Sequence, residues 1–140
     1  MITNKNVMIT GAAGFIGSHL TETLLEHNNF LILIDNFNEY YPGKEEQLNR
    51  ILHIYEQNKE YTLIKADIVE KTVFEKINYE IDYIFHLAAQ AGVRYSIDHA
   101  SEVAYNNIVG TVNLFEYALK LNLIKKIIYS SSSSVYGNPV

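Results

Sequence analysis

The chain has 140 residues, enough for one domain with a hydrophobic core, and 48% of them are hydrophobic, as in ordinary globular proteins. The net charge of −5 and the lack of a basic tract argue against nucleic acid as a partner. The absence of cysteine excludes disulfides and thiolate chemistry, and the histidines show no metal-binding spacing, so no metal is expected. Without a signal peptide or membrane span in the sequence, we expect a cytoplasmic protein with no membrane partner.

A glycine-rich turn follows the first apolar run. Val7 to Thr10 is typical of a buried strand, and Gly11, Gly14 and Gly17 follow at intervals of three. Apolar residues then recur at intervals of four, as on one face of a helix: Ile16, Leu20 and Leu24. A strand, a glycine turn and a helix in this order favour phosphate binding. Glycines allow the tight turn and close approach, and the helix N-terminus offers N–H groups and a positive dipole.

An acidic residue ends the second apolar run. Phe30 to Ile34 predicts another buried strand, and Asp35 follows it, 24 residues after Gly11. An acid at this strand tip accepts hydrogen bonds from the ribose of a bound dinucleotide. Its charge would repel the 2′-phosphate of NADP, so NAD is favoured. The alternatives are a tight turn without a ligand, with Asp35 as a helix N-cap or a solvated acid.

The remaining elements alternate between helix and strand. We expect a loop over 36–43 and then, in chain order, a helix at Lys44–Gln57, a strand at Tyr61–Ile64, a short helix at Val73–Ile77, a strand at Tyr83–Leu87, a long helix at about Ser101–Leu121 and a strand at Lys126–Ser130. We expect the sheet-facing stripe of the long helix to be Ile108, Val112, Phe115 and Leu119, with Val103 and Leu114 outside it.

This alternation predicts an α/β fold. Right-handed crossovers give a parallel sheet in the order 3-2-1-4-5, with helices on both faces. Ligands of such sheets bind at the carboxyl ends of the strands, where the order reverses. The loops at Asp35, Asp67, Ala88 and Ser130 all open on that edge, which predicts a shared site.

Several polar residues near that edge have two interpretations each. Asp67 is an adenine-side residue or an ordinary turn acid, and Asn107 is a site residue or a buried amide bonded to a loop. Arg94 is a substrate residue or a surface cation. His86 ends an apolar strand and is better explained as a hydrogen-bonded core histidine than as a catalytic one. The serine run 130–134 alone indicates a flexible loop.

Six stretches together resemble one family. They are TGAAGFIGSH at 10–19, DNFNEYY at 35–41, AD at 66–67, HLAAQAGVRYS at 86–96, NNIVGT at 106–111 and SSSSVYG at 131–137. This combination is similar to the extended short-chain dehydrogenase/reductase family, in its branch of NAD-dependent nucleotide-sugar epimerases and dehydratases. The second and fourth stretches are most similar to UDP-glucuronate 4-epimerases. The resemblance covers essentially the whole chain and implies a Rossmann-like fold.

The resemblance also implies roles for individual residues. Those implied to bind the cofactor NAD are Gly11, Gly14, Phe15, Ile16 and Gly17 at the pyrophosphate, Asp35 and Asn36 at the adenosine ribose, Asp67 and Ile68 at the adenine, and Leu87, Ala88, Ala89, Gln90, Asn107 and Ser130 on the nicotinamide side. Ser132 matches the catalytic hydroxyl that bonds the sugar oxygen at the oxidised carbon. Arg94 lies where a nucleotide-sugar substrate, UDP-glucuronate, would approach.

The sequence lacks a catalytic tyrosine and lysine at the position that the family resemblance implies. The resemblance implies a Tyr-x-x-x-Lys pair about two dozen residues beyond Ser132, whereas the sequence ends eight residues beyond it. Tyr55 and Lys59 have the spacing but lie in a predicted helix away from the site, and Tyr136 has no such lysine. We therefore expect residues 1–140 to be the NAD-binding portion of a longer epimerase, inactive alone and without its C-terminal substrate domain.

Other functions stay open on the sequence alone. The same fold carries nucleotide-sugar dehydratases and decarboxylases, and the chain also fits a non-catalytic NAD-binding module or an interaction fragment without a ligand. Self-association, as a homodimer or otherwise, is expected from two surfaces. One is the edge of the fifth strand, where Ile127 and Ile128 lie, and the other is the long helix, which resembles half of a dimer interface in the family.

Overall fold

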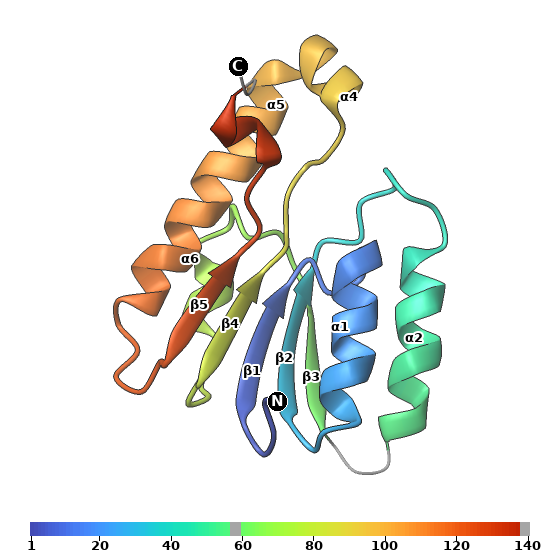
Figure 1. Cartoon of the computed structure of the whole chain (residues 1–140), viewed down its shortest axis with the longest axis vertical. Coiled ribbons are helices and arrows are strands. Elements are labelled where there is room, and N and C mark those ends of the chain that lie inside the picture. Colours follow the sequence, from blue (N-terminus) through green and yellow to red (C-terminus); the bar gives the residue numbers. More distant parts are fainter. Residues whose placement is uncertain (57–59, 138–140) are drawn as a thin grey trace.

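A computed structural model describes residues 1–56 and 60–137. Five parallel strands form one sheet in the order β3-β2-β1-β4-β5 (Figure 1). The predicted strand order is therefore confirmed. The strands are β1 (Asn6–Thr10), β2 (Phe30–Asp35), β3 (Tyr61–Lys65), β4 (Tyr83–His86) and β5 (Lys126–Tyr129).

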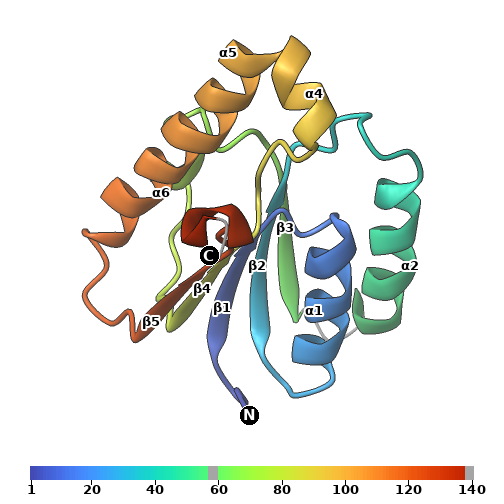
Figure 2. The same ribbon diagram turned by 45° about the horizontal axis from the view of Figure 1, so that its top comes forward.

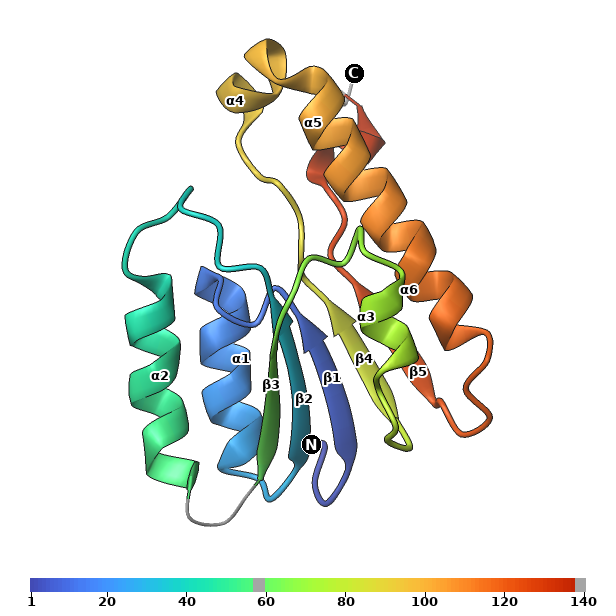
Figure 3. The same ribbon diagram turned by 180° about the vertical axis from the view of Figure 1, so that it is seen from behind.

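Helices cover both faces of this sheet. On one face lie α1 (Phe15–Leu25) and α2 (Lys44–Tyr55), and the view from behind shows α3 (Thr72–Glu75) and α6 (Gly110–Ala118) on the other (Figure 3). A continuous helical segment precedes α6, made of α5 (Ala100–Ala104) and a π-helical turn, η2 (Tyr105–Val109). In the described part of the chain, no helix has the length and apolarity needed to cross a membrane.

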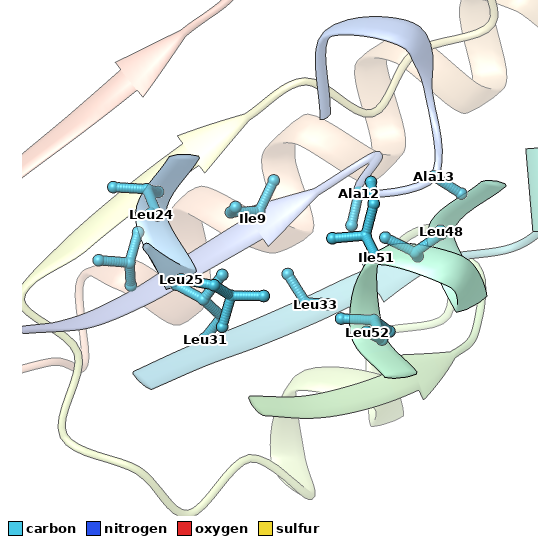
Figure 4. Close-up of a cluster of buried hydrophobic side chains, with 11 residues drawn as sticks. Ile9, Ala12, Ala13, Leu24, Leu25, Leu31, Leu33, Leu48, Ile51 and Leu52 are labelled. Atoms are coloured by element: carbon cyan, nitrogen blue, oxygen red, sulfur yellow. The ribbon is translucent and has the colours of Figure 1, made fainter. Parts of the chain in front are cut away.

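The core has two halves, one on each face of the sheet. Successive side chains of a strand point to opposite faces, so Val7 and Ile9 of β1 pack under α1 and α2, while Met8 packs under α3 and α6. Figure 4 shows the first half, in which Leu31 and Leu33 of β2 meet leucines of both covering helices. Both faces are covered, which explains why the central strands read as continuous apolar runs.

Most predicted elements are present with shifted ends. The third and fourth strands end at Lys65 and His86, the fifth ends at Tyr129, and the short helix is α3 at 72–75. The helix predicted to Gln57 ends at Tyr55, and Gln57 lies outside the described residues, as does Lys59. Two short elements were not predicted: α4 (Val93–Asp98), and a 3₁₀ turn, η3 (Ser133–Tyr136), in the serine run.

The prediction for the long helix was wrong about its buried face. The stripe expected to cover the sheet is exposed: Ile108, Val112, Phe115 and Leu119. Leu114, expected outside that stripe, is 0% exposed and packs with Met8 and Ile84 on the sheet. The inward face instead combines small, polar and apolar residues: Gly110, Asn113, Leu114 and Ala118. Gly110 is required there, because a Cβ would lie 2.7 Å from the Ile68 side chain.

This reassignment of the helix face predicts unequal effects of two leucine truncations. Leu114→Ala should lower the free energy of unfolding by about 2–5 kcal/mol, because it leaves a cavity against the sheet. Leu119→Ala on the same helix, where the side chain is 87% exposed, should change it by less than about 0.5 kcal/mol. Urea unfolding followed by circular dichroism measures both. Equal losses for the two variants would contradict the assigned face.

Candidate functional site

A pocket of about 290 Å³ opens at the carboxyl ends of the central strands. Figure 2, in which this edge comes forward, shows the loops that follow β1, β2 and β4 meeting there below α4 and α5. Most of the predicted site residues line it: Gly11, Gly14, Phe15, Ile16, Gly17, Asp35, Asn36, Asp67, Ile68, Leu87, Ala88, Ala89, Gln90 and Ser130. Segments that are far apart in the sequence therefore share one concave surface, as the sheet topology predicts.

The glycine turn is the most crowded part of this pocket. Gly11 has φ +74°, and a Cβ on it would lie 2.6 Å from the Ala88 nitrogen in the loop after β4. A Cβ on Gly17 would lie 2.0 Å from the Gly11 carbonyl oxygen. Gly17 therefore lets α1 lie directly against the turn at Gly11. Both positions exclude a side chain by contact, and Gly11 does so by its positive φ as well.

The N-terminus of α1 points its open backbone donors into the pocket. Its N-cap residue is Gly14, which has no side chain. The first N–H groups of the helix therefore have no side-chain cap from this residue. A Cβ on Gly14 would lie only 3.2 Å from the Gly11 carbonyl oxygen. N–H groups without a side-chain cap, at the positive end of an eleven-residue helix, are a favourable place for an anion.

Asp35 connects the tip of β2 to this turn. Its carboxylate is buried, with the residue 7% exposed, and accepts hydrogen bonds from Ala13 N at 3.0 Å and Phe37 N at 2.8 Å. Asp35 is therefore neither a helix N-cap nor a solvated acid, the two alternatives left by the sequence. Each oxygen accepts one backbone hydrogen bond and retains a further lone pair, so the carboxylate can also accept from a ligand hydroxyl.

The loop after β3 lines one end of the pocket. Asp67 accepts from Val69 N at 3.1 Å, as a turn residue does, and also from the Asn36 side-chain amide at 2.8 Å. Asp67 therefore has the hydrogen bond of a turn residue and also lines the pocket, and its adenine-side role stays a prediction. Asn113 of α6 donates to the carbonyls of Ile68 and Val69, at 3.1 and 2.8 Å, and so holds this loop against α6.

His86 is a buried histidine with both ring nitrogens hydrogen-bonded. Its Nδ1 lies 2.6 Å from Thr10 Oγ1, and its Nε2 lies 2.9 Å from Thr111 Oγ1. Thr111 donates its only hydroxyl proton to the Asn107 carbonyl, so Nε2 must donate to Thr111. Burial disfavours a second proton on the ring and lowers the pKa of His86, so Nδ1 accepts from Thr10. The ring is therefore neutral and fixed in one tautomer, which agrees with the interpretation as a satisfied core histidine.

Asn107 supports the pocket from behind. Its side-chain oxygen accepts from Gln90 N at 2.7 Å, and its amide donates to the Gln90 carbonyl at 3.1 Å. These bonds to a loop agree with the second interpretation, although the Asn107 side chain is only part-buried, and Asn107 does not line the pocket. It lies in the π-helical turn η2, and such turns occur frequently at functional sites.

Comparisons with known proteins identify the family. The sequence profile described as GDP-mannose 4,6 dehydratase matches residues 8–140. The chain belongs to the NAD-dependent epimerase/dehydratase family. An uncharacterized protein of Methanocaldococcus jannaschii is 46% identical over 138 residues, which cover 95% of this chain and 41% of that protein. UDP-glucuronate 4-epimerase 3 of Arabidopsis thaliana is 36% identical over 135 residues, which cover 94% and 30%.

Solved structures of this epimerase/dehydratase family share the fold. The UDP-N-acetylglucosamine 4-epimerase of Methanobrevibacter ruminantium, in complex with UDP-N-acetylmuramic acid, has a TM-score of 0.82 at 42% identity, over 99% of this chain and 41% of that one. The UDP-glucose 4-epimerase of Bifidobacterium longum, in complex with NAD⁺ and UDP, has a TM-score of 0.80 at 32% identity, over 94% and 38%. The chain therefore spans well under half the length of these relatives.

Three residues that the family resemblance implied lie outside the pocket lining. Arg94 is exposed on α4, and Ser132 is exposed just before η3. Asn107 does not line the pocket but hydrogen-bonds Gln90, which does. Conversely, the pocket is also lined by residues to which the sequence assigned no role in the site: Asn38, Tyr40, Tyr41, Lys44, Ile34, Ala66, Ala91 and Asn106. The first three belong to the DNFNEYY stretch, which carried a signal for the family but none for individual contacts. No cluster of potential metal ligands occurs among the described residues.

Neutral His86 predicts a pH-dependent stability. Burial lowers the pKa of His86 from 6.5 to about 4, so between these values the unfolded chain binds a proton that the folded chain rejects. The contribution of neutral His86 to the free energy of unfolding is therefore complete above pH 6.5 and is lost as the pH falls towards 4. His86→Gln, which retains an acceptor and a donor, should remove a pH-dependent term of about 2 kcal/mol from the free energy of unfolding.

Urea denaturation at pH 7, 6 and 5 measures this term. His53→Gln is the matched control, because His53 is exposed on α2 and its imidazole lies beside only Glu56 in the described structure. The explanation fails if His86→Gln and the unsubstituted chain lose stability in parallel over this pH range.

Proposed function

We propose that the pocket binds NAD. The observation that carries this proposal is that the uncapped N-terminus of α1 and the carboxylate of Asp35 open into the same pocket. A dinucleotide presents a pyrophosphate and a ribose with adjacent hydroxyls, which need an anion site and a hydrogen-bond acceptor at such a separation. The NAD⁺ in the related Bifidobacterium longum epimerase supports this choice of ligand.

Different residues of the pocket would contact different parts of the bound NAD. The backbone of Phe15 and Ile16 donates to the pyrophosphate, and Asp35 accepts from the adenosine ribose. Asp67 and Ile68 flank the adenine, while the loop 87–90 and Ser130 line the way to the nicotinamide ribose. Because Asn107 hydrogen-bonds both the backbone N–H and the backbone carbonyl of Gln90, that loop is preorganised for the ligand.

The proposed parent activity is epimerisation of a nucleotide sugar, with UDP-glucuronate as the first candidate. Similarity to the UDP-glucuronate 4-epimerases of Arabidopsis, and the stretches 35–41 and 86–96, support it. NAD in this chemistry accepts and returns a hydride at the sugar C4. Ser132 would hydrogen-bond the sugar oxygen, and the Arg94 guanidinium, exposed on α4, would attract the anionic substrate.

Two observations favour other substrates or reactions. The 42% identity to a UDP-N-acetylglucosamine 4-epimerase favours an N-acetylated sugar, and the matching family profile is named for a dehydratase. Tyr40–Lys44 and Tyr61–Lys65 have the Tyr-x-x-x-Lys spacing among the described residues, but neither lies about two dozen residues beyond Ser132, where the resemblance implies the catalytic pair. We therefore expect the 140-residue chain to bind cofactor without turning over any of these sugars.

Cofactor binding gives the direct test of the proposed site. The chain should bind NAD⁺ more tightly than NADP⁺, since Asp35 accepts from the 2′-hydroxyl but repels a 2′-phosphate. Asp35→Ala should cost about 1–3 kcal/mol of NAD⁺ binding and narrow the preference. Isothermal titration calorimetry measures both. Asp82→Ala is the matched control, because it removes a carboxylate that accepts a backbone N–H outside the pocket, just before β4, and it should leave both affinities unchanged. Equal affinity of the unsubstituted chain for both cofactors would contradict the proposal.

We also propose that the chain self-associates. Within the described residues β5 pairs only with β4, so its outer edge presents unpaired backbone groups beside half-buried Ile127 and Ile128. The exposed stripe of the long helix adds a second apolar surface, made of Ile108, Val112, Phe115 and Leu119. A continuous apolar surface of this kind is typical of an interface.

Light scattering at two concentrations tests self-association. We expect a mass above 16.0 kDa that rises on tenfold concentration from the micromolar range. Phe115→Asp or Ile128→Asp should restore the monomer and so show which surface is responsible. Ile54→Asp, an exposed position on α2, is the control that should leave association unchanged. A constant monomer mass for the unsubstituted chain would refute the proposal.

A further inference from the structure

Lys44 occupies an unfavourable place for a cation. It is the first residue of α2, where the helix dipole is positive and its N-cap, Gly43, supplies no side-chain hydrogen bond. Glu45 and Glu46, which follow it, have the charge that a first helical turn favours. Helix formation alone therefore does not explain a lysine here. Residues that break a local rule without a structural gain commonly serve a site.

The side chain of Lys44 is directed into the pocket. Its Nζ donates to Asn38 Oδ1 at 2.8 Å and lies 3.5 Å from Asp35 Oδ1, and the side chain is 14% exposed. The lysines of the other ion pairs in the described structure, Lys65, Lys71 and Lys125, are each about half exposed. Lys44 alone among these four lines the pocket. A partly desolvated cation thus lies beside the acid assigned to the ribose.

We propose that Lys44 is a specificity-determining residue for the 2′ position of the adenosine ribose, an inference that rests on the proposed NAD site. Asp35 by itself would reject a 2′-phosphate strongly. The ammonium beside it offsets much of that repulsion, because the two groups are close enough to act as a pair on any charge placed next to them. The preference for NAD is therefore set by Lys44 and Asp35 together.

The two cofactors should respond differently to the loss of this cation. A 2′-phosphate carries close to two negative charges at neutral pH, whereas the 2′-hydroxyl of NAD carries none. An ammonium has three donors, one of which is used by Asn38. The Nζ also lies 3.5 Å from Asp35 Oδ1 in the pocket lining, so loss of this cation should weaken the binding of a phosphate beside Asp35 much more than that of a hydroxyl.

Titration calorimetry of NAD⁺ and NADP⁺ on the 140-residue chain tests the inference. Lys44→Gln should raise the ratio of Kd for NADP⁺ to Kd for NAD⁺ by about tenfold, while Kd for NAD⁺ itself changes by less than about threefold. Lys44→Arg, which keeps the charge, should leave the ratio near that of the unsubstituted chain. The difference between Lys44→Gln and the unsubstituted chain should shrink in high salt, because it is electrostatic.

Arg50→Gln is the matched control, since it removes one positive charge from the exposed side of the same helix, where Arg50 pairs with Glu46. Its ratio should not change. Lys44 has no role in selection if Lys44→Gln leaves the ratio unaltered while NAD⁺ still binds, or if Arg50→Gln changes the ratio equally. Failure of the unsubstituted chain to bind either cofactor would instead overturn the NAD site itself, and this inference with it.

Discussion

At Gly11 three backbone segments come closer together than a side chain would allow. A methyl group on Gly11 would lie 2.6 Å from the Ala88 nitrogen, and one on Gly17 would lie 2.0 Å from the Gly11 carbonyl oxygen. The Gly11 N–H donates to the Ile34 carbonyl at 2.8 Å, which adds β2 to the junction. This contact fixes the positions of three parts of the pocket: the N-terminus of α1, the acid at the tip of β2 and the loop after β4.

Polar side chains extend this junction across the pocket. Thr10, His86 and Thr111 connect the ends of β1 and β4 to the helical segment η2–α6, and Asn107 carries the connection to Gln90. The Gln90 side chain then accepts from Asn38, whose own oxygen accepts from Lys44. The adenosine and nicotinamide sides of the proposed site are thus parts of one hydrogen-bonded structure, in which each member limits the movement of the next.

Local preferences are broken mainly at this edge of the sheet. Phe37 has φ +51°, which non-glycine residues rarely adopt, and its N–H donates to Asp35. Lys44 stands at the wrong end of a helix for its charge, and a π-helical turn interrupts the helix at Asn107. These departures occur where the chain shapes the pocket, whereas the central strands follow their sequence patterns closely. Such a distribution is expected where a stable scaffold supports a less regular site.

The sequence by itself determined the strand order, the glycine turn, the position of Asp35 at a strand tip and the family, because periodicity and spacing are local signals that a parallel sheet converts into positions. It did not determine which face of the long helix is buried. Ile108, Val112, Phe115 and Leu119 form the more apolar stripe, yet Leu114, Asn113 and Gly110 face the sheet. Only the tertiary structure decided this, because Gly110 must admit the Ile68 side chain and Asn113 must bond the loop after β3. It also brought Lys44 to Asp35, since a contact between a loop and a helix start leaves no periodic trace in the sequence.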